Sequence, residues 1–173
     1  KLVYWELEMK KSDSPEMQEV FETQKQEANT EFFKFISKNY ASWVSPKSTD
    51  GPIMSHTLLK YKVLPHLEKG TPLFFVLIDN LRFDQWKIIQ PKFAESFRIQ
   101  EEETFYSILP TATQYARNAI FAGMLPVDIE KQFPNQWKND DEEGGKNLHE
   151  EEFNKMVLDE KMEEMHETVV GGR

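Results

Sequence analysis

The sequence contains no cysteine among its 173 residues. Disulfide bridges, thiolate metal sites and cysteine nucleophiles are therefore excluded, and any metal ion must be held by carboxylates, imidazoles or hydroxyls. Basic residues are in the minority and the net charge is -9 at pH 7, which argues against a protein held on nucleic acid by phosphate neutralisation alone. The sequence also lacks an apolar run of the roughly 20 residues that span a bilayer, and its first residues do not follow the pattern of a signal peptide. We therefore expect a cytoplasmic protein with no membrane insertion.

What the sequence does contain is helical periodicity in its first third. The opening KLVYWELEMK is expected to be helical, and Ser14 before Pro15 is the pattern of an N-cap followed by proline at the first helical position. Apolar residues then recur at three-to-four spacing, at Met17, Val20, Phe21, Ala28, Phe32, Phe35 and Ile36. This spacing predicts a long amphipathic helix. The turn-forming stretch SPKSTDGP ends it, and MSHTLLKYKVLPHLEKG predicts a shorter helix.

The middle of the chain changes to a pattern typical of an α/β fold. PLFFVLI, residues 72–78, is a continuous apolar run between turn residues, as in a strand that is buried on both faces. The helix expected after it carries one apolar face, at Phe83, Trp86, Ile89 and Phe93. TFYSIL, residues 104–109, has the composition of a second strand. Because parallel strands end at the same edge of a sheet, we expect Asp79 and the hydroxyls of PTAT to lie together.

LPTATQYARNAIFAGMLP, residues 109–126, places hydroxyl groups at the start of a helix. If Thr113 is the N-cap, its hydroxyl lies beside unpaired N–H groups and the positive end of the helix dipole, where a phosphate can bind. Asp79 would then offer an anionic oxygen to a divalent cation, and a metal-activated threonine could attack phosphorus. The alternative is purely structural, because threonine commonly caps helices and aspartate commonly ends strands.

Two motifs in this region resemble a known family. FFVLIDNLRFDQW followed by YSILPTATQYARNAIFAGMLP is similar to the opening of the PglZ branch of the alkaline phosphatase superfamily, and in particular to PorX-type response regulators of type IX secretion. The resemblance extends from the helical stretch near Lys1 to about Phe153. It implies an upstream receiver domain, a sensor kinase as partner, a helical linker, and a parallel-sheet phosphatase-like domain that is incomplete in this chain.

The resemblance also implies roles for individual residues. Asp79 falls on the zinc ligand that ends the family's first strand, and Thr113 falls on the nucleophile, which also contacts the metal. Thr111 is then a turn residue. Arg82 belongs to the motif, either paired with a carboxylate or supporting the site. The family implies two zinc ions, and its Asp-His motif, which supplies further ligands, is absent from this sequence.

The other candidate residues have weaker patterns. His56 and His66 precede the first expected strand, and we expect them to be surface or packing residues. His149 follows the pattern of a solvated helix start among glutamates, and it or His166 would have to complete a metal site if one forms in this chain alone. Lys146 follows two glycines, so it either lies in a flexible surface loop or contacts a substrate phosphate as a point charge.

We therefore expect three segments. These are a helical linker over residues 1–69, the first part of a PglZ domain over residues 70–153, and an acidic tail or arm over residues 154–173. The expected function is that of a zinc-dependent phosphodiesterase or phosphatase, with phosphodiesters such as cyclic or linear oligonucleotides as substrates and Thr113 as nucleophile. The alternative is a non-enzymatic signalling module that forms a homodimer. Since catalytic zinc takes at least three protein ligands, the 173 residues alone are expected to be inactive.

Overall fold

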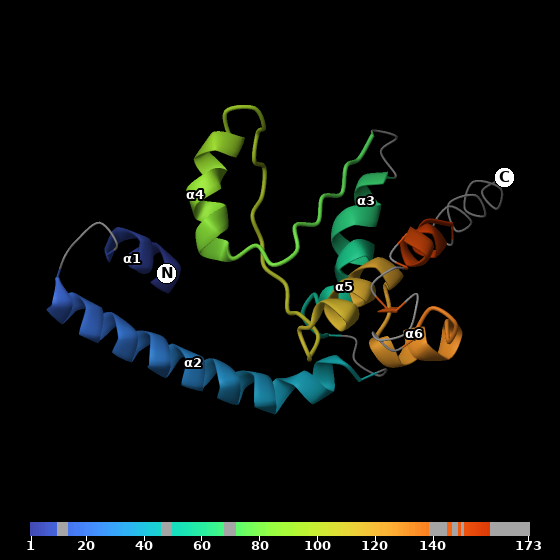
Figure 1. Cartoon of the computed structure of the whole chain (residues 1–173), viewed down its shortest axis with the longest axis horizontal. Coiled ribbons are helices and arrows are strands. Elements are labelled where there is room, and N and C mark those ends of the chain that lie inside the picture. The colour runs from blue at the N-terminus through green and yellow to red at the C-terminus, as the bar shows by residue number, and fades with distance from the viewer. Residues whose placement is uncertain are drawn as a thin grey trace. The chain divides into compact units, whose positions relative to one another are not determined.

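The computed structural model describes residues 1–9, 14–45, 50–67, 72–138, 145–146, 149 and 151–159 (Figure 1). The chain divides into two compact units. The first unit consists of Lys1–Gly51 and Ile78–Glu103, and the second consists of Pro52–Leu77 and Thr104–Arg173. Each unit is thus assembled from separate stretches of the chain. Among the described residues, no helix is long and apolar enough to cross a membrane.

The first unit begins with the two helices that the sequence predicts, α1 (Leu2–Met9) and α2 (Pro15–Trp43). Ser14 is the N-cap of α2 in an extended conformation, and Pro15 is the first helical residue, as predicted. Trp5 of α1 packs edge-on against Phe21 of α2, with 5.6 Å between ring centroids. Phe21 is 3% exposed. Burial of this aromatic pair holds the two helices together.

Helix α4 (Phe83–Phe93) completes the first unit. It follows a turn in which Asn80 adopts the left-handed conformation, with φ of 59°, a region that asparagine tolerates better than most residues do. Of the apolar face predicted for this helix, the aromatic residues make packing contacts, whereas Ile89 is 43% exposed. Trp86 packs edge-on against Phe93 at 5.8 Å, and Phe93 stacks on Phe97 at 4.5 Å. These aromatic contacts join the helix to the segment that follows it.

The second unit contains short helices around a small core. A 3₁₀ turn η1 (Ser55–Thr57), a π-helical turn η2 (Leu59–Val63) and α3 (Leu64–Leu67) replace the single short helix that the sequence predicts. Helices α5 (Thr113–Ala122) and α6 (Pro126–Gln132) follow, and residues 151–159 are also helical.

The core of the second unit lies between α5, α6 and the helix at residues 151–159. Ala122, Ile129 and Phe153 are at most 1% exposed and form one cluster. The ring of Phe153 meets that of Phe133 edge-on at 5.9 Å. Gly123 ends α5 in the left-handed conformation, with φ of 61°, which glycine adopts without steric cost.

The α/β fold class predicted from the sequence is wrong for the part of the chain that the structure describes. Neither residues 72–78 nor residues 104–109 form a strand there. The only sheet-type pairing among the described residues is an isolated parallel bridge between Met54 and Tyr106. In this bridge the Tyr106 N–H donates to the Ile53 carbonyl at 2.9 Å, and the Ser55 N–H donates to the Tyr106 carbonyl at 3.1 Å.

The physical reason for the error lies in the apolar run. A strand exists only where a neighbouring strand exchanges backbone hydrogen bonds with it, and Tyr106 pairs with the segment before η1 instead of with residues 72–78. The run is not buried on both faces, since Phe74 is 91% exposed and Val76 is 74% exposed. Phe75 instead packs edge-on against Phe121 of α5, at 6.2 Å. The run is therefore an extended segment that rests on a helix.

Candidate functional site

Thr113 is the first residue of helix α5. The sequence pattern allows it to be the N-cap, the residue that directly precedes the helix. The N-cap is Ala112, whose extended backbone directs its carbonyl into the helix. This carbonyl accepts hydrogen bonds from the N–H groups of Tyr115 at 3.0 Å and Ala116 at 2.9 Å. The N-cap interpretation of Thr113 is therefore wrong, although the helix does begin where the apolar periodicity begins.

The N-terminus of α5 has the properties of an anion-binding end of a helix. Alanine has no side-chain oxygen, so this N-cap makes no side-chain capping hydrogen bond. Backbone N–H groups in a first turn have no partners within the helix and lie at the positive end of its dipole. Thr113 is half-buried beside them, whereas Thr111 is exposed. The hydroxyl of Thr113 is thus the one that starts the helix, and an anionic oxygen could bind next to it.

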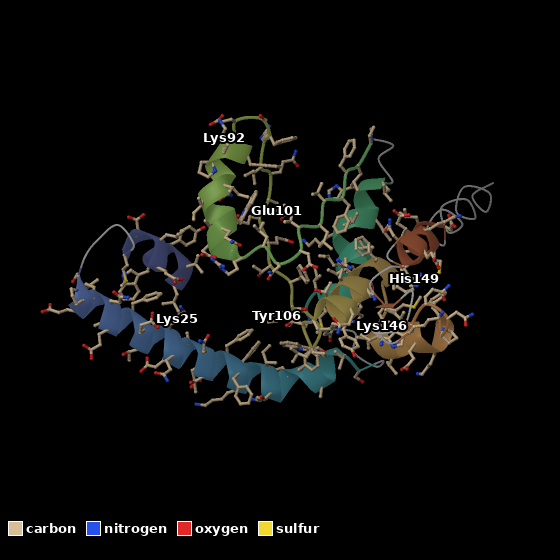
Figure 2. All side chains as sticks on the ribbon, in the orientation of Figure 1. Lys25, Lys92, Glu101, Tyr106, Lys146 and His149 are labelled. Atoms are coloured by element: carbon tan, nitrogen blue, oxygen red, sulfur yellow. The ribbon has the colours of Figure 1, made fainter. Side chains whose placement is uncertain are left out.

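Behind this first turn, Asn118 connects α5 to residue 146. Its side-chain amide donates hydrogen bonds to the carbonyl of Gln114 at 2.9 Å and to that of Lys146 at 2.7 Å. Lys146 is 8% exposed, and its Nζ lies 5.3 Å from the ring centroid of Trp137 (Figure 2). Trp137 in turn packs against Tyr115 at 5.8 Å. Lys146 is therefore held near the α5 helix, and its assignment to an exposed surface loop is wrong.

Asp79 belongs to the first unit, in the turn that precedes α4. It is exposed and stands next to the left-handed Asn80. Arg82, three residues later, forms a two-pronged ion pair with Asp84: its Nε and Nη2 atoms each lie 3.0 Å from a carboxylate oxygen. This hydrogen bonding raises the pKa of Arg82. Of the two roles considered for Arg82, pairing with a carboxylate is the one present.

Asp79 and Thr113 lie in different units, so the structure does not define one site that contains both. Among the residues that the structure describes, no three aspartate, glutamate or histidine side chains are grouped so that they could hold a metal ion. One carboxylate and one hydroxyl are too few for a catalytic zinc ion, which takes three protein ligands. The described residues therefore do not fit a complete zinc site.

The histidines have other surroundings. His56 of η1 is half-buried, and its Nδ1 has no hydrogen-bond partner within the part of the chain that the structure describes. Burial lowers the pKa of His56 below its ordinary value, and the negative charge of Asp128 opposes this effect. His149 Nδ1 lies 3.1 Å from a carboxylate oxygen of Glu152 (Figure 2). His166 lies outside the described residues. The ring of His149 is thus paired with a carboxylate.

Sequence reasoning missed Asn118 and Trp137, which hold Lys146 in place. A signal for Asn118 was present, since it is a polar residue within the apolar stretch of α5. Buried amides need hydrogen-bond partners, so such a residue commonly marks a tie to another segment. The sequence around Trp137 contains no comparable pattern that predicts its contact with Lys146.

Comparison with known families defines the class of this protein. Residues 58–170 match the model of the BREX system PglZ alkaline phosphatase-like domain. This match covers more than half of the chain, so the chain belongs to the PglZ family of alkaline phosphatase-like domains. Residues 1–44 match a second family model, the PorX response regulator linker domain. No curated protein matches the chain.

The two matches together define the arrangement of a PorX-like response regulator, in which a linker precedes a phosphatase-like output domain. The resemblance inferred from the two sequence motifs is thereby confirmed. The linker match ends at residue 44, and the PglZ match begins at residue 58. The segment containing α4 belongs to the PglZ match in sequence, yet it lies in the same compact unit as the linker helices.

Proposed function

We propose that this chain is the output region of a PorX-like response regulator, which acts in the full-length protein as a zinc-dependent phosphodiesterase with Thr113 as nucleophile. The observation that supports this proposal is the position of Thr113 as the first residue of α5, directly after an alanine N-cap, within a chain that matches the PglZ family. Cyclic or linear oligonucleotides are the proposed substrates, and a receiver domain and sensor kinase are the proposed regulatory partners in type IX secretion.

The chemistry proposed for Thr113 is an in-line displacement at phosphorus. Its Oγ forms a bond to the phosphorus atom as the bond to the leaving alkoxide breaks, and the hydroxyl proton passes to solvent. The first backbone N–H groups of α5 bind a non-bridging oxygen of the phosphate and stabilise the charge that develops there. Water then hydrolyses the phosphothreonine, which releases phosphate monoester and restores the hydroxyl.

Asp79 is proposed as one ligand of the zinc ion. The remaining ligands are not among the residues that the structure groups together, so we derive no chemical step through the metal. Lys146 is buried and lies near the α5 helix through Asn118, but its Nζ lies over the ring of Trp137. We therefore assign it no role in the displacement.

The position of Thr113 allows its proposed role as nucleophile to be tested with a substitution that has little effect on folding. Because Ala112 is the N-cap, Thr113→Ala removes the hydroxyl but no capping hydrogen bond. Alanine is also a better helix former than threonine. In the full-length protein with zinc, we expect Thr113→Ala to lower turnover of a chromogenic phosphodiester by more than about a thousandfold, with residual activity in Thr113→Ser.

Thr111→Ala is the matched control, since Thr111 is exposed and precedes the helix. It should retain the wild-type rate. A chelator should abolish the wild-type activity, and zinc should restore it. Full turnover in a folded Thr113→Ala variant would show that Thr113 is not the nucleophile.

The second candidate function is a non-enzymatic module that dimerises under control of a receiver domain. The observation that favours it is the apolar surface of α2, where Phe32 is 55% exposed and Phe33 is 70% exposed. Under this alternative the purified full-length protein has no chelator-sensitive turnover, whereas Phe33→Ala weakens self-association in analytical ultracentrifugation. Chelator-sensitive turnover together with an unchanged monomer–dimer equilibrium in Phe33→Ala would exclude it.

A further inference from the structure

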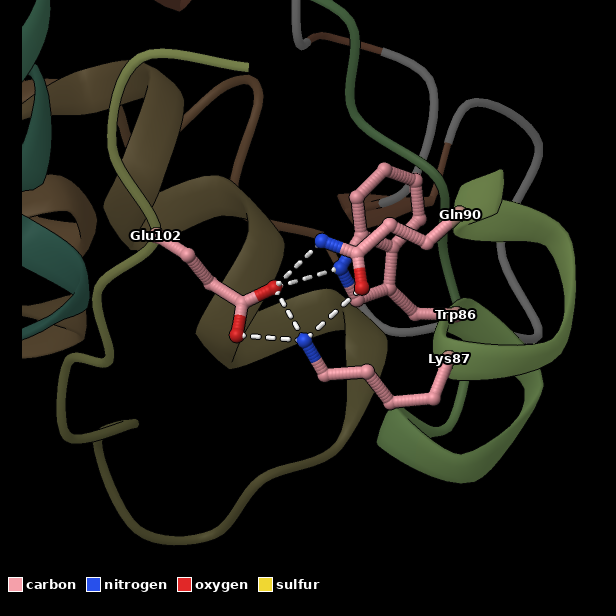
Figure 3. A network of polar contacts seen from close by, with 4 residues as sticks. All are labelled: Trp86, Lys87, Gln90 and Glu102. Carbon is pink, nitrogen blue, oxygen red and sulfur yellow. Dashed lines mark hydrogen bonds and ion pairs between the residues drawn. The ribbon is translucent and has the colours of Figure 1, made fainter. Parts of the chain in front are cut away.

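The side chain of Lys87 on helix α4 is fixed by a network of polar contacts. Its Nζ lies 2.6 Å from both carboxylate oxygens of Glu102 and donates to the Gln90 side-chain oxygen at 2.9 Å (Figure 3). The indole N–H of Trp86 donates to the same carboxylate at 2.9 Å. The side chain of Lys87 is only 8% exposed. Lysine is rarely this buried unless its charge is paired, so α4 and the segment after it hold this ammonium group in one place.

The same ammonium group contacts two aromatic rings. Lys87 Nζ lies 5.5 Å from the ring centroid of Tyr4 in α1 and 4.9 Å from that of Phe83 in α4. The two rings meet edge-on at 6.3 Å. A cation within about 6 Å of a ring centroid is attracted to the face of the ring. Hydrogen bonding to Glu102 and then to Tyr4 also raises the pKa of Lys87, so the group that binds the rings is charged.

The contact between Lys87 and Tyr4 joins two regions that match different families. Tyr4 belongs to the linker match and Lys87 to the PglZ match. Both residues lie in the same compact unit, and helix α1 contacts helix α4 within it. Lys87 is therefore a point at which the linker touches the phosphatase-like region of the chain.

The contact between α1 and α4 has no apolar core. Neither helix, both of which the structure describes in full, contains a buried residue, and the rings of Tyr4 and Phe83 are 50% and 40% exposed. The contact between α1 and α2, by contrast, includes Phe21, which is 3% exposed and meets Trp5 at 5.6 Å. Contacts with little buried apolar area open more readily than packed ones. Helix α1 is therefore held less firmly by α4 than by α2.

We propose that α4 carries a preformed binding site for linker helix α1, in which the fixed ammonium group of Lys87 binds the ring of Tyr4, and that this contact opens while the rest of the unit stays folded. The proposal goes beyond the proposed function and does not depend on it, since it requires neither a nucleophile nor a metal ion. It gives the linker a reversible point of contact with the PglZ region.

The first test measures how firmly α1 is held, by hydrogen exchange of the full chain followed by mass spectrometry. Helix α1 has eight residues, and a helix of this length is marginal on its own, so exchange of its amides reports the contacts that hold it. A cation–π contact at a partly exposed site changes an opening equilibrium by about two- to fivefold. We expect Tyr4→Leu and Lys87→Met each to speed exchange in α1 by about this factor, while amides near Phe21 keep their rates.

Lys92→Met is the matched control, because Lys92 lies on the same helix, is 83% exposed and pairs with Glu95 at 2.7 Å. It should leave exchange in α1 unchanged. In the double variant Tyr4→Leu/Lys87→Met, exchange should be no faster than in the faster single variant, since both changes remove the same contact. Unchanged exchange in either single variant, or effects that multiply in the double variant, would overturn the proposal. Equal acceleration in α1 and near Phe21 would also overturn it, because the contact would then open only with the whole unit.

The second test measures whether the site on α4 is preformed. Trp86 donates its indole N–H to Glu102, so the NMR resonance of this N–H reports the network around Lys87. We expect Tyr4→Leu to leave the resonance nearly unchanged, because Glu102 and Gln90 still hold Lys87. Lys87→Met should shift it, because the carboxylate loses its cation. A shift as large in Tyr4→Leu as in Lys87→Met would overturn the preformed site. If Lys87→Met does not fold, Tyr4→Leu still decides both tests, since Tyr4 is half exposed and any clear shift of the indole resonance in it would have the same meaning.

Discussion

The side-chain amide of Asn118 donates a 2.7 Å hydrogen bond to the backbone carbonyl of Lys146, 28 residues further along the chain. Asn118 is 0% exposed, and the same nitrogen donates to the Gln114 carbonyl one helical turn earlier. The orientation of the amide is fixed by these two acceptors, because an oxygen in its place could donate to neither. Asn118 therefore holds the segment at residue 146 against α5.

Replacement of Asn118 should destabilise the second unit. Asn118→Ala leaves the Lys146 carbonyl without its buried donor, and such losses cost about 1–3 kcal/mol. Urea denaturation followed by tryptophan fluorescence should show a lower midpoint, since Trp137 lies next to Lys146. Asn135→Ala is the control, because Asn135 is exposed, and it should change stability by less than about 0.5 kcal/mol. Equal midpoints for the two variants would contradict the assignment.

Replacement of a residue in the core of the second unit should destabilise it more than replacement of Asn118 does. Phe153 is 0% exposed and packs with Ile129 and Ala122. Phe153→Ala should lower the free energy of unfolding by about 3–5 kcal/mol, the usual range for a buried phenylalanine. Phe74→Ala removes a ring of the same size that is 91% exposed, so its effect should be small. Should Phe74→Ala prove as destabilising as Phe153→Ala, the exposed position of the apolar segment would be incorrect.

The Lys87–Glu102 pair predicts a defined response to acid. Hydrogen bonds from Lys87 and then from Trp86 lower the pKa of Glu102 below its ordinary 4.5. The stabilisation from this carboxylate is therefore complete above pH 4.5 and is lost as the pH falls through the lower folded value. The indole N–H resonance of Trp86 should report this titration with a midpoint below 4.5.

Lys87→Met should move that midpoint upward, because the first cause of the shift is removed. Glu95 pairs with the exposed Lys92, so Lys92→Met should leave the Trp86 titration unchanged. A wild-type midpoint at or above 4.5 would show that Glu102 is not paired in solution.

His56 predicts a second pH dependence, in the other unit. Its pKa lies below 6.5, chiefly because burial disfavours the charged ring. The folded state therefore favours the neutral imidazole of His56, whereas the unfolded state takes up a proton near pH 6.5. The contribution of His56 to stability is complete above pH 6.5 and is lost as the pH falls through the lower folded value. The urea midpoint of the wild-type chain should therefore drop further between pH 8 and pH 5 than that of His56→Gln. Parallel profiles for the two proteins would rule out His56 as the titrating group.

The helices could be predicted from the sequence because their signals are local. Ser14 and Pro15 fix the start of α2, and Gly123 fixes the end of α5, through backbone preferences that need no distant partner. The strands could not be predicted in the same way. An apolar run indicates burial only if another segment covers it, and the pattern of residues 72–78 contains no information about such a partner.

The candidate site was predicted only in part for the same reason. The beginning of α5 at Thr113 followed from the periodicity, while its N-cap was misplaced by one residue because Ala112 has no capping side chain to reveal it. The catalytic roles of Thr113 and Asp79 remain predictions. The tie from Asn118 to Lys146 depends on a contact between distant residues, which spacing along the chain does not reveal.

The interleaving of the two units has a consequence for synthesis of the protein. Lys1–Gly51 and Ile78–Glu103 belong to one unit, and Pro52–Leu77 belongs to the other. During synthesis, Pro52–Leu77 of the second unit therefore leaves the ribosome before α4, the third helix of the first unit. Helices α1 and α2 can pack with α4 only after that. Non-local pairing of this kind delays folding, and apolar side chains stay accessible to chaperones in the interval. A single protease cut between residues 52 and 77 would divide both units at once.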